Sequence, residues 1–228
     1  MGLGKKIRLK RLFSHPSGLL SSVAIDHFIG YHRDLYTHTG LFTLVRTIAS
    51  IAEGKPDAIT LHKGVALRCW EPYAGSIPLI MQSLAARADD TVDELLAVPE
   101  DAVRLGADAF ATCCFVRGAS EGAHIRRTAD LVRQAEIWDM PVILHTYPRK
   151  FTPEGVSISF APEDLAWAVR CGIEAGVDVI KVPYCGNVTS YRQIVENSPV
   201  PVVAAGGPRT ETLLEGLETH PETPISLH

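Results

Sequence analysis

Lys181 is the residue of this sequence whose setting most strongly suggests chemistry. It lies inside the run Val179-Ile180-Lys181-Val182-Pro183, whose apolar residues predict a buried strand. Burial penalises a charged amine, so lysine is tolerated there when the amine is paired or neutral. A neutral amine can form a Schiff base with a carbonyl, and lowering its pKa from ~10.4 to near 7 needs about 4–5 kcal/mol. The alternatives are a lysine that snorkels from a strand end or one that pairs with a carboxylate.

Other polar side chains end apolar runs and could serve the same reaction. Asp26 could move protons at substrate hydroxyls, pair with a lysine, or cap the helix after the first strand, and His27 beside it is expected to contact the substrate. Lys63 could lower the pKa of Lys181 by like-charge repulsion, contact phosphate, or face solvent. Tyr147 offers a phenol for proton transfer at a carbanion, or it is a packed tyrosine before a proline.

Anion binding is expected where the later strands end. Gly206 and Gly207 could expose backbone N–H groups to a phosphate, and Arg209 could add a charge-assisted contact, although a Gly-Gly turn is also an ordinary loop. Arg149 could hold a second anion or cap a carboxylate. The histidines are loosely spaced and form no H-x-H or H-E-x-x-H motif, so we expect no metal and no other cofactor.

The elements that position these residues are indicated by short apolar runs that begin in two alternating ways, which we call openings. In one opening, a Gly at position 54, 106 or 176 is followed shortly by Asp and then by the apolar run. In the other opening, a Pro at position 78, 141 or 201 begins the run. Gly suits the left-handed position just past a helix, and Pro suits the first position of a strand. Both openings therefore predict the end of a helix followed by the start of a strand.

About seven buried strands alternate with stretches of helical periodicity, which predicts an α/β fold with a parallel sheet. The predicted strands are 23–27, 58–63, 79–84, 109–116, 142–147, 179–182 and 202–205. We predict a TIM (β/α)8 barrel whose eighth strand is missing or truncated, because a helix predicted at 210–217 is followed only by a possible stub at 224–227. A doubly wound sheet is the rival, but it would need a Gly-rich phosphate loop after the first strand.

Length and composition fit a single barrel domain over residues 1–228. The chain has 46% hydrophobic residues and a net charge of -4, so it has no general attraction to nucleic acid or anionic membranes. The basic residues near the start predict a solvated leader over about residues 1–18. Five cysteines without a C-x-x-C pair and no apolar run of ~18 residues predict a cytoplasmic protein, and the incomplete barrel gives reason to expect a homo-oligomer.

In order and spacing, these motifs resemble the class I fructose-bisphosphate aldolases of the archaeal and DhnA type, which are related to deoxyribose-phosphate aldolases. The resemblance runs from about residue 20 to residue 212 and rests on the motifs Ile25-Asp26-His27, His62-Lys63-Gly64, Tyr147-Pro148-Arg149, Asp178-Val179-Ile180-Lys181 and Ala205-Gly206-Gly207-Pro208-Arg209. It implies a Schiff base at Lys181, proton transfer by Tyr147, an acid/base Asp26 and phosphate at Gly206 and Gly207.

The sequence departs from the family pattern in three places. Phe28 stands where the family has Gly after Asp-His, and Lys150 and Phe151 follow Tyr-Pro-Arg where the family usually has Gly. The family's last strand with its Gly-Arg turn has no counterpart after Thr212. The resemblance still implies a lyase of glycolytic type, cleaving or forming a C–C bond in a phosphorylated ketose such as fructose 1,6-bisphosphate. The alternatives are an aminodideoxyheptulosonate-synthase-like transaldolase, a thiolase-like relative using the same lysine, and a non-catalytic sugar-phosphate-binding subunit.

Overall fold

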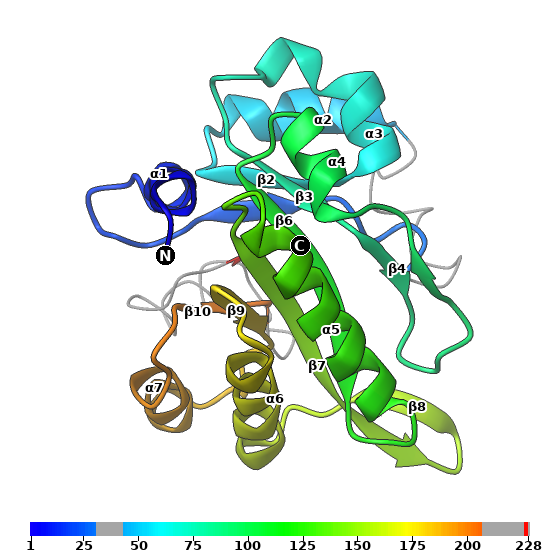
Figure 1. The fold of residues 1–228 in the computed structure, drawn as a ribbon. Coiled ribbons are helices and arrows are strands. Elements are labelled where there is room, and N and C mark those ends of the chain that lie inside the picture. The colour runs from blue at the N-terminus through cyan, green and yellow to red at the C-terminus, as the bar shows by residue number, and fades with distance from the viewer. Residues whose placement is uncertain (31–42, 207–225, 228) are drawn as a thin grey trace.

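A computed structural model of the chain describes residues 1–30, 43–206 and 226–227, in which strands and helices alternate (Figure 1). The helices are α1 (Leu3–Leu12), α2 (Leu44–Glu53), α3 (Lys63–Cys69), α4 (Pro99–Arg104), α5 (Glu121–Glu136), α6 (Pro162–Ala175) and α7 (Val188–Glu196), with a 3-10 turn at Glu71–Tyr73. The strands of the main sheet are β1 (Ser22–Ala24), β2 (Ala58–His62), β3 (Leu79–Gln82), β6 (Ala109–Val116), β7 (Val142–Thr152), β9 (Val179–Val182), β10 (Val202–Ala204) and β11 (Ser226–Leu227).

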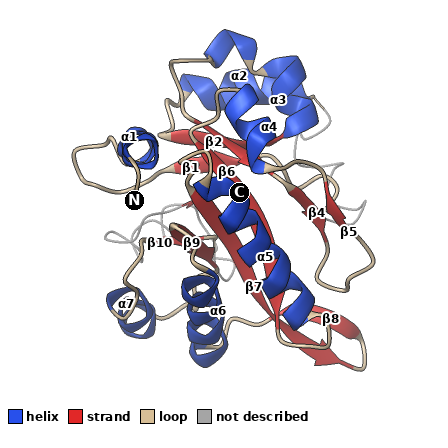
Figure 2. Ribbon diagram, in the orientation of Figure 1, coloured by secondary structure: helices blue, strands red, loops and turns tan. Residues whose placement is uncertain are grey.

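The main sheet is parallel and curls around an interior, with helices α2 to α7 on its outer face (Figures 1 and 2). Its order is β10-β9-β7-β6-β3-β2-β1-β11, so strands that follow one another along the chain are neighbours in the sheet. A doubly wound sheet would reverse direction at a switch point, and this order does not. The predicted α/β barrel class is confirmed, with all seven predicted strands present.

In the part of the chain that the structure describes, the eighth strand is short, which is consistent with the predicted truncated barrel. β11 has two residues, and it pairs in parallel with β1 through Ser22 and Ser226. Within residues 1–30, 43–206 and 226–227, β10 and β11 do not pair, so the two ends of the sheet are not joined by a strand ladder.

Two antiparallel hairpins were not predicted from the sequence. β4 (Leu84–Ala86) pairs with β5 (Asp93–Leu95), and β8 (Gly155–Ile158) folds back on the long end of β7. The strand predicted at 79–84 therefore ends at Gln82, and the chain turns through Ser83 into β4. Both hairpins follow barrel strands, so they stand at the carboxyl end of the sheet.

The Gly openings form left-handed turns at two of their three positions. Gly106 and Gly176 have φ values of 69° and 83°, as predicted for residues that end a helix. The prediction is wrong at Gly54, which is right-handed with φ of -73°, while Lys55 takes the left-handed conformation with φ of 49°. The following turn still leads into β2.

The aspartates of these openings join the starts of neighbouring strands. Asp57 accepts a hydrogen bond from the backbone N–H of Ser21 at 2.7 Å, and Asp178 accepts one from the backbone N–H of Val142 at 2.8 Å. A carboxylate accepting a backbone N–H is a charge-assisted bond, which is stronger than a neutral one. The repeated aspartate thus fixes the amino-terminal edge of the sheet.

The basic segment that the sequence predicts to be a solvated leader instead forms α1 and packs against this same edge. Lys5 pairs with Asp178 at 3.0 Å, and Arg11 pairs with Asp108 at 3.1 Å. Leu12 is fully buried among interior residues of the sheet. The basic residues therefore complement the aspartates of the openings, a match that the local sequence around either group does not reveal. α1 lies apart from the helices on the outer face (Figure 1).

Side chains alternate along each strand between the two faces of the curled sheet. The outward set packs against the helices in the largest apolar cluster, which includes Leu61, Met81, Phe110, Leu144 and Ile180. The inward set near the strand starts forms a smaller apolar layer, which includes Leu12, Ala58, Ile80, Ile143 and Val179. No helix in the part of the chain that the structure describes is long and apolar enough to cross a membrane.

Candidate active site

A polar layer lies on the inward face directly beyond the apolar layer. Because inward positions recur every second residue, Ile80, Ile143 and Val179 of the apolar layer are each followed two residues later by a polar side chain. The members of this polar layer are Gln82, Cys113, His145 and Lys181, with His62 on β2 and Asp26 just past β1. The layer gathers residues from five parallel strands and from the segment that follows β1, at one level of the interior.

Lys181 is buried in this layer, with 3% of its surface exposed. It is in register with His145 on β7 and with Val203 on β10. Burial lowers the pKa of its amine from 10.5 to about 8, although the negative charge of Asp26 acts in the opposite direction. The amine can therefore lose its proton near neutral pH, which a nucleophilic lysine needs.

Asp26 is the carboxylate of the polar layer. Its Oδ2 accepts a hydrogen bond from Gln82 at 2.8 Å, and its buried Oδ1 has no hydrogen-bond partner within the described parts of the chain. Burial raises the pKa of Asp26, but His27, His145, Lys181 and His62 outweigh it and hold the pKa well below its ordinary value. Asp26 is therefore ionised, with one oxygen available to a lysine or a substrate hydroxyl.

Two histidines flank this carboxylate. The Nδ1 atom of His27 lies 3.7 Å from Asp26 Oδ1, and burial lowers the pKa of His27 although Asp26 raises it. His62 lies with its Nε2 atom 3.0 Å from the backbone carbonyl oxygen of Asp26. Because a carbonyl oxygen can only accept a hydrogen bond, Nε2 of His62 is the donor, and this bond holds the backbone of Asp26 in place.

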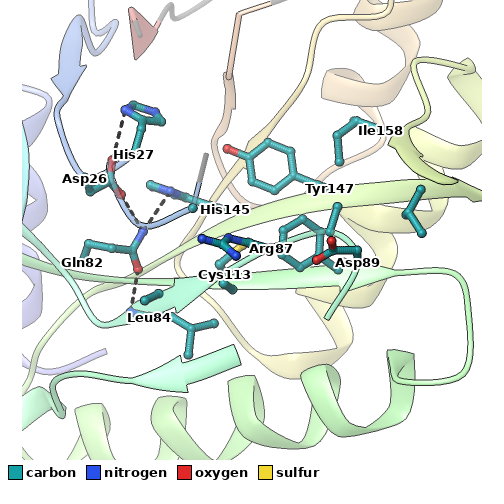
Figure 3. A pocket seen from close by; sticks show the side chains of 16 residues that line it. Asp26, His27, Gln82, Leu84, Arg87, Asp89, Cys113, His145, Tyr147 and Ile158 are labelled. Atoms are coloured by element: carbon teal, nitrogen blue, oxygen red, sulfur yellow. Dashed lines mark hydrogen bonds and ion pairs between the residues drawn. The ribbon is translucent and has the colours of Figure 1, made fainter. Parts of the chain in front are cut away.

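A cavity of about 320 Å³ opens beside the polar layer (Figure 3). Asp26, Gln82 and His145 lie at one side of it, and Tyr147 projects from β7, packed against Phe115 with ring centroids 5.8 Å apart. The two hairpins supply further walls, through residues 84–88 of the first and through Val156 and Ile158 of the second. Lys181 does not line the cavity in this structure, but its neighbour in register, His145, does.

The structure brings four of the predicted site residues, Lys181, Asp26, His27 and Tyr147, to one end of the curled sheet. Lys63 does not join them. It is the first residue of α3, and its amine donates a hydrogen bond to Asp101 of α4 at 2.7 Å. Because α3 and α4 cover the outer face, this lysine acts between helices and does not face the cavity.

Arg149 also has a role other than the predicted anion contact. Its side chain is buried, and it donates hydrogen bonds to Asp90 Oδ2 at 2.8 Å, Ser120 Oγ at 2.8 Å and the backbone carbonyl of Arg117. These acceptors saturate the guanidinium group, so Arg149 ties the β4–β5 hairpin to the loop before α5.

The predicted phosphate site lies mostly outside the described residues. Gly206 has φ of 67°, and its carbonyl oxygen accepts a hydrogen bond from the backbone N–H of Tyr184 at 2.8 Å. Gly207 and Arg209 lie outside the residues that the structure describes. The left-handed turn at Gly206 places the start of this segment at the carboxyl end of β10.

Several residues of the site were not predicted. His145 and Tyr147 share a face because they are two residues apart, so the period of two along β7 was a signal for His145. Gln82 had no such signal, because an amide at the end of an apolar run is an ordinary event. Arg87, which lines the cavity, lies in a turn that the apolar pattern does not mark. Within the described residues, no group of three or more His, Cys, Asp or Glu is arranged to hold a metal ion.

Comparison with known proteins relates this geometry to two groups of enzymes. The 2-amino-4,5-dihydroxy-6-oxo-7-(phosphonooxy)heptanoate synthase of Streptomyces griseus is 30% identical over 212 residues, which cover 90% of this chain and 73% of that protein. The 2-amino-3,7-dideoxy-D-threo-hept-6-ulosonate synthase of Halobacterium salinarum is 32% identical over 206 residues, 90% of this chain and 74% of that protein. The class 1 fructose-bisphosphate aldolase of Thermoproteus tenax is 30% identical over 160 residues, 68% of this chain and 59% of that protein.

The fold and the family agree with these relatives. An archaeal fructose-1,6-bisphosphate aldolase, solved with its catalytic lysine covalently bound to the carbinolamine intermediate of the substrate, superposes with a TM-score of 0.80 at 25% identity, covering 98% of this chain and 90% of that one. The family model that matches residues 20–221 is that of the DeoC/LacD family aldolases. The chain therefore belongs to the DeoC/LacD family of aldolases, which confirms both the resemblance and the lyase class expected from the sequence.

Proposed function

We propose that this chain is a class I aldolase that cleaves or forms a C–C bond in a phosphorylated ketose through a Schiff base on Lys181. The observation that carries the proposal is the buried amine of Lys181, whose pKa of about 8 lies within reach of neutral pH beside the ionised Asp26. A buried amine of this kind is a nucleophile toward a ketone, and the resulting iminium accepts the electron pair of a breaking C–C bond.

The proposed cleavage assigns one proton transfer to each neighbouring group. The neutral amine of Lys181 attacks the ketone carbon, and the hydroxyl of the carbinolamine takes a proton from solvent and leaves as water, which gives the cationic iminium; the final hydrolysis returns that proton to solvent. The C3–C4 bond then breaks as Asp26 accepts the proton of the C4 hydroxyl, which releases an aldehyde and leaves an enamine. Tyr147 protonates the enamine carbon and regains a proton by way of Asp26, and water releases the ketone product from Lys181.

A phosphorylated substrate is supported by cationic and backbone groups near the cavity. Arg87 lines the cavity, and its Nε donates to the backbone carbonyl of Ile29 at 3.2 Å. Within the described parts of the chain, its guanidinium has no carboxylate within ion-pair distance, so it can meet an anionic substrate. Gly206 begins the glycine turn that we propose, with Gly207 and Arg209, as the main phosphate contact.

Borohydride trapping tests the nucleophile. The protein is incubated with fructose 1,6-bisphosphate or dihydroxyacetone phosphate, reduced with sodium borohydride, digested and analysed by mass spectrometry. We expect the adduct on Lys181 in the wild type and in Lys63→Gln, and no adduct in Lys181→Met. An adduct only on Lys63, or none with any ketose phosphate tried, would contradict the proposal.

A transfer reaction is the second candidate, and one observation favours it. The two relatives named as heptanoate or heptulosonate synthases align over 90% of this chain, whereas the class 1 fructose-bisphosphate aldolase aligns over 68%. A transaldolase would use the same Lys181 adduct but pass the enamine to an added acceptor. Triose phosphates formed from fructose 1,6-bisphosphate alone support the aldolase, whereas turnover that requires an aldehyde acceptor supports transfer.

We also propose that the chain works in the cytoplasm as a homo-oligomer. All five cysteines are free thiols, which suits a reducing compartment. Large apolar side chains remain exposed, including Ile137 at 77%, and exposed apolar surface is typical of subunit contacts.

A further inference from the structure

Gln82 lies at the centre of the polar layer, and each hydrogen-bonding position of its amide is filled. Its Oε1 accepts from the backbone N–H of Leu84 at 3.1 Å and from that of Ser83 at 3.0 Å. The Ser83 N–H is shared with the carbonyl of Ala111, whereas the Leu84 bond goes to Gln82 alone. On the other side, Nε2 lies 2.8 Å from Asp26 Oδ2 and 3.2 Å from His145 Nδ1 (Figure 3).

These contacts fix the orientation of the amide. In the reversed orientation, the NH2 group would face the N–H of Leu84, and the oxygen would face the carboxylate of Asp26. Two donors or two acceptors in contact within a buried site are strongly unfavourable. Nε2 is therefore the donor, with one hydrogen directed to Asp26 and the other to His145.

The orientation of Gln82 in turn fixes the tautomer of His145. A ring nitrogen that accepts a hydrogen bond carries no proton, so Nδ1 of His145 is bare and its proton is on Nε2. Protonating Nδ1 would set it against the NH2 group of Gln82. His145 thus stays neutral with its Nε2–H as the ring's donor, and the ring lines the cavity.

His145 is also the neighbour in register of the nucleophile. His145 on β7 and Lys181 on β9 are paired across adjacent parallel strands and point to the same inward face. Neighbouring strands lie about 4.8 Å apart, so a carbonyl attacked by the amine of Lys181 is within reach of the imidazole. A neutral imidazole that donates to a carbonyl oxygen can polarise it without giving up its proton.

We propose that Gln82 is a positioning residue that holds His145 as a neutral Nε2–H donor, and that His145 donates this hydrogen bond to the carbonyl oxygen attacked by Lys181. As the C–N bond forms, the C=O π electrons move to the oxygen, where His145 stabilises the developing negative charge. The imidazole keeps its proton throughout, and the hydroxyl of the carbinolamine obtains its proton from the amine. The inference rests on the proposed Schiff-base function of Lys181.

The tautomer can be measured directly on the unmodified protein. The full chain is labelled with ¹⁵N in its histidine rings, and the signals of His145, one of nine histidines, are identified by their loss in His145→Phe. At neutral pH we expect a bare Nδ1 and a protonated Nε2 for His145. A proton on Nδ1, or a doubly protonated ring, would overturn the proposal without any appeal to a variant's stability.

A double-mutant cycle tests whether Gln82 acts through His145. We expect His145→Phe and Gln82→Met each to lower kcat by roughly 10²–10³, the usual effect of losing one donor to a developing oxyanion, with little change in KM. The double variant should be within about threefold of His145→Phe alone, because both changes remove one function. Losses that multiply would show that Gln82 acts by another route and would overturn the proposal.

A matched control and the trapping experiment separate the possible failures. Gln134→Met, on the exposed face of α5, should leave kcat and the His145 signals unchanged. If borohydride traps no adduct on Lys181 in the wild type, the proposed function itself fails. If the adduct forms but Gln82→Met turns over at the wild-type rate, only the role of Gln82 and His145 fails.

Discussion

The amine of Lys181 shares its compartment with the carboxylate of Asp26 and the imidazoles of His27, His62 and His145. Because this compartment is buried, small changes of charge within it alter protonation more than they would at the surface. Burial lowers the pKa of Lys181, whereas Asp26 raises it, and the balance is a pKa of about 8. The two residues are therefore best tested through pH profiles.

The rate of Schiff-base formation should follow the protonation of Lys181. The neutral amine is the nucleophile, so kcat/KM should rise with pH through about 8 and level off above it. Lys63→Gln should show the same midpoint, because the amine of Lys63 pairs with Asp101 between two helices. A profile measured with a ketose phosphate from pH 6 to about pH 10 that is flat, or that shifts in Lys63→Gln, would contradict this assignment.

Replacing Asp26 should change both the rate and the midpoint of that profile. Asp26→Asn removes a proton acceptor, so kcat should fall by roughly 10²–10⁴. It also removes an anion that stabilises the charged amine, so the pKa of Lys181 should fall and the midpoint should move below 8. A midpoint that stays in place or moves upward would show that Asp26 does not act on Lys181.

Site residues could be predicted from the sequence where their type is unusual for their position. A lysine inside an apolar strand and an aspartate just after one are such cases, and both lie in the polar layer. Gln82 and Cys113 were missed because their role depends on which strands curl together and at which level. Lys63 was misassigned because a strand end and the first residue of a helix look alike in sequence, and here the helix turns the side chain outward.

Helix α1 is the element whose role differs most from the expectation. Leu12 is the fully buried side chain by which α1 joins the inner apolar layer, so Leu12→Ala should lower the free energy of unfolding by about 2–5 kcal/mol. Ile7→Ala on the same helix removes a side chain that is 44% exposed and should cost no more than about 1 kcal/mol. Urea unfolding of both variants measures the difference, and equal costs would show that α1 is not anchored by its buried face.

The β4–β5 hairpin is held by Arg149, for which the sequence left open an anion contact or a carboxylate partner, and the partner is Asp90. Arg149→Met leaves the Arg117 carbonyl and Asp90 without their donor, so it should destabilise the fold by about 2–3 kcal/mol. Because this hairpin forms a wall of the cavity, KM should rise as well.

The matched control for Arg149 is Arg170, which pairs with Glu174 on α6 and has a side chain that is 69% exposed. An exposed pair contributes little, so Arg170→Met should change stability by no more than about 0.5 kcal/mol and leave KM unchanged. If the two variants behave alike in unfolding and kinetics, Arg149 does not anchor the hairpin.

The elements of the barrel could be predicted because each strand is both apolar and marked by an opening with Gly or Pro. The two hairpins could not, because β5 and β8 are short, partly exposed and lack an apolar run. The packing of α1 was hidden for a different reason. Its partners Asp108 and Asp178 lie far along the chain, and only the curled arrangement of the strand starts brings them together.

For the whole molecule, the two ends of the sheet are not joined by a strand ladder within the residues that the structure describes, and large apolar side chains are exposed, which is why we expect an oligomer. Light scattering coupled to size exclusion should give a mass that is a multiple of 24.8 kDa over a range of protein concentrations. A mass of one chain at every concentration would contradict this expectation.

The packing of α1 also has a consequence for the nucleophile. The apolar layer that contains Leu12 is adjacent to the level of Lys181. Val179 belongs to that layer, and it precedes Lys181 by two residues on the same face of β9. Water admitted at that level would hydrate the ammonium ion and raise the local polarity, which favours the charged amine. The first twelve residues therefore help to keep the pKa of Lys181 low from a distance, because Leu12 helps to exclude water from the apolar layer beside the amine.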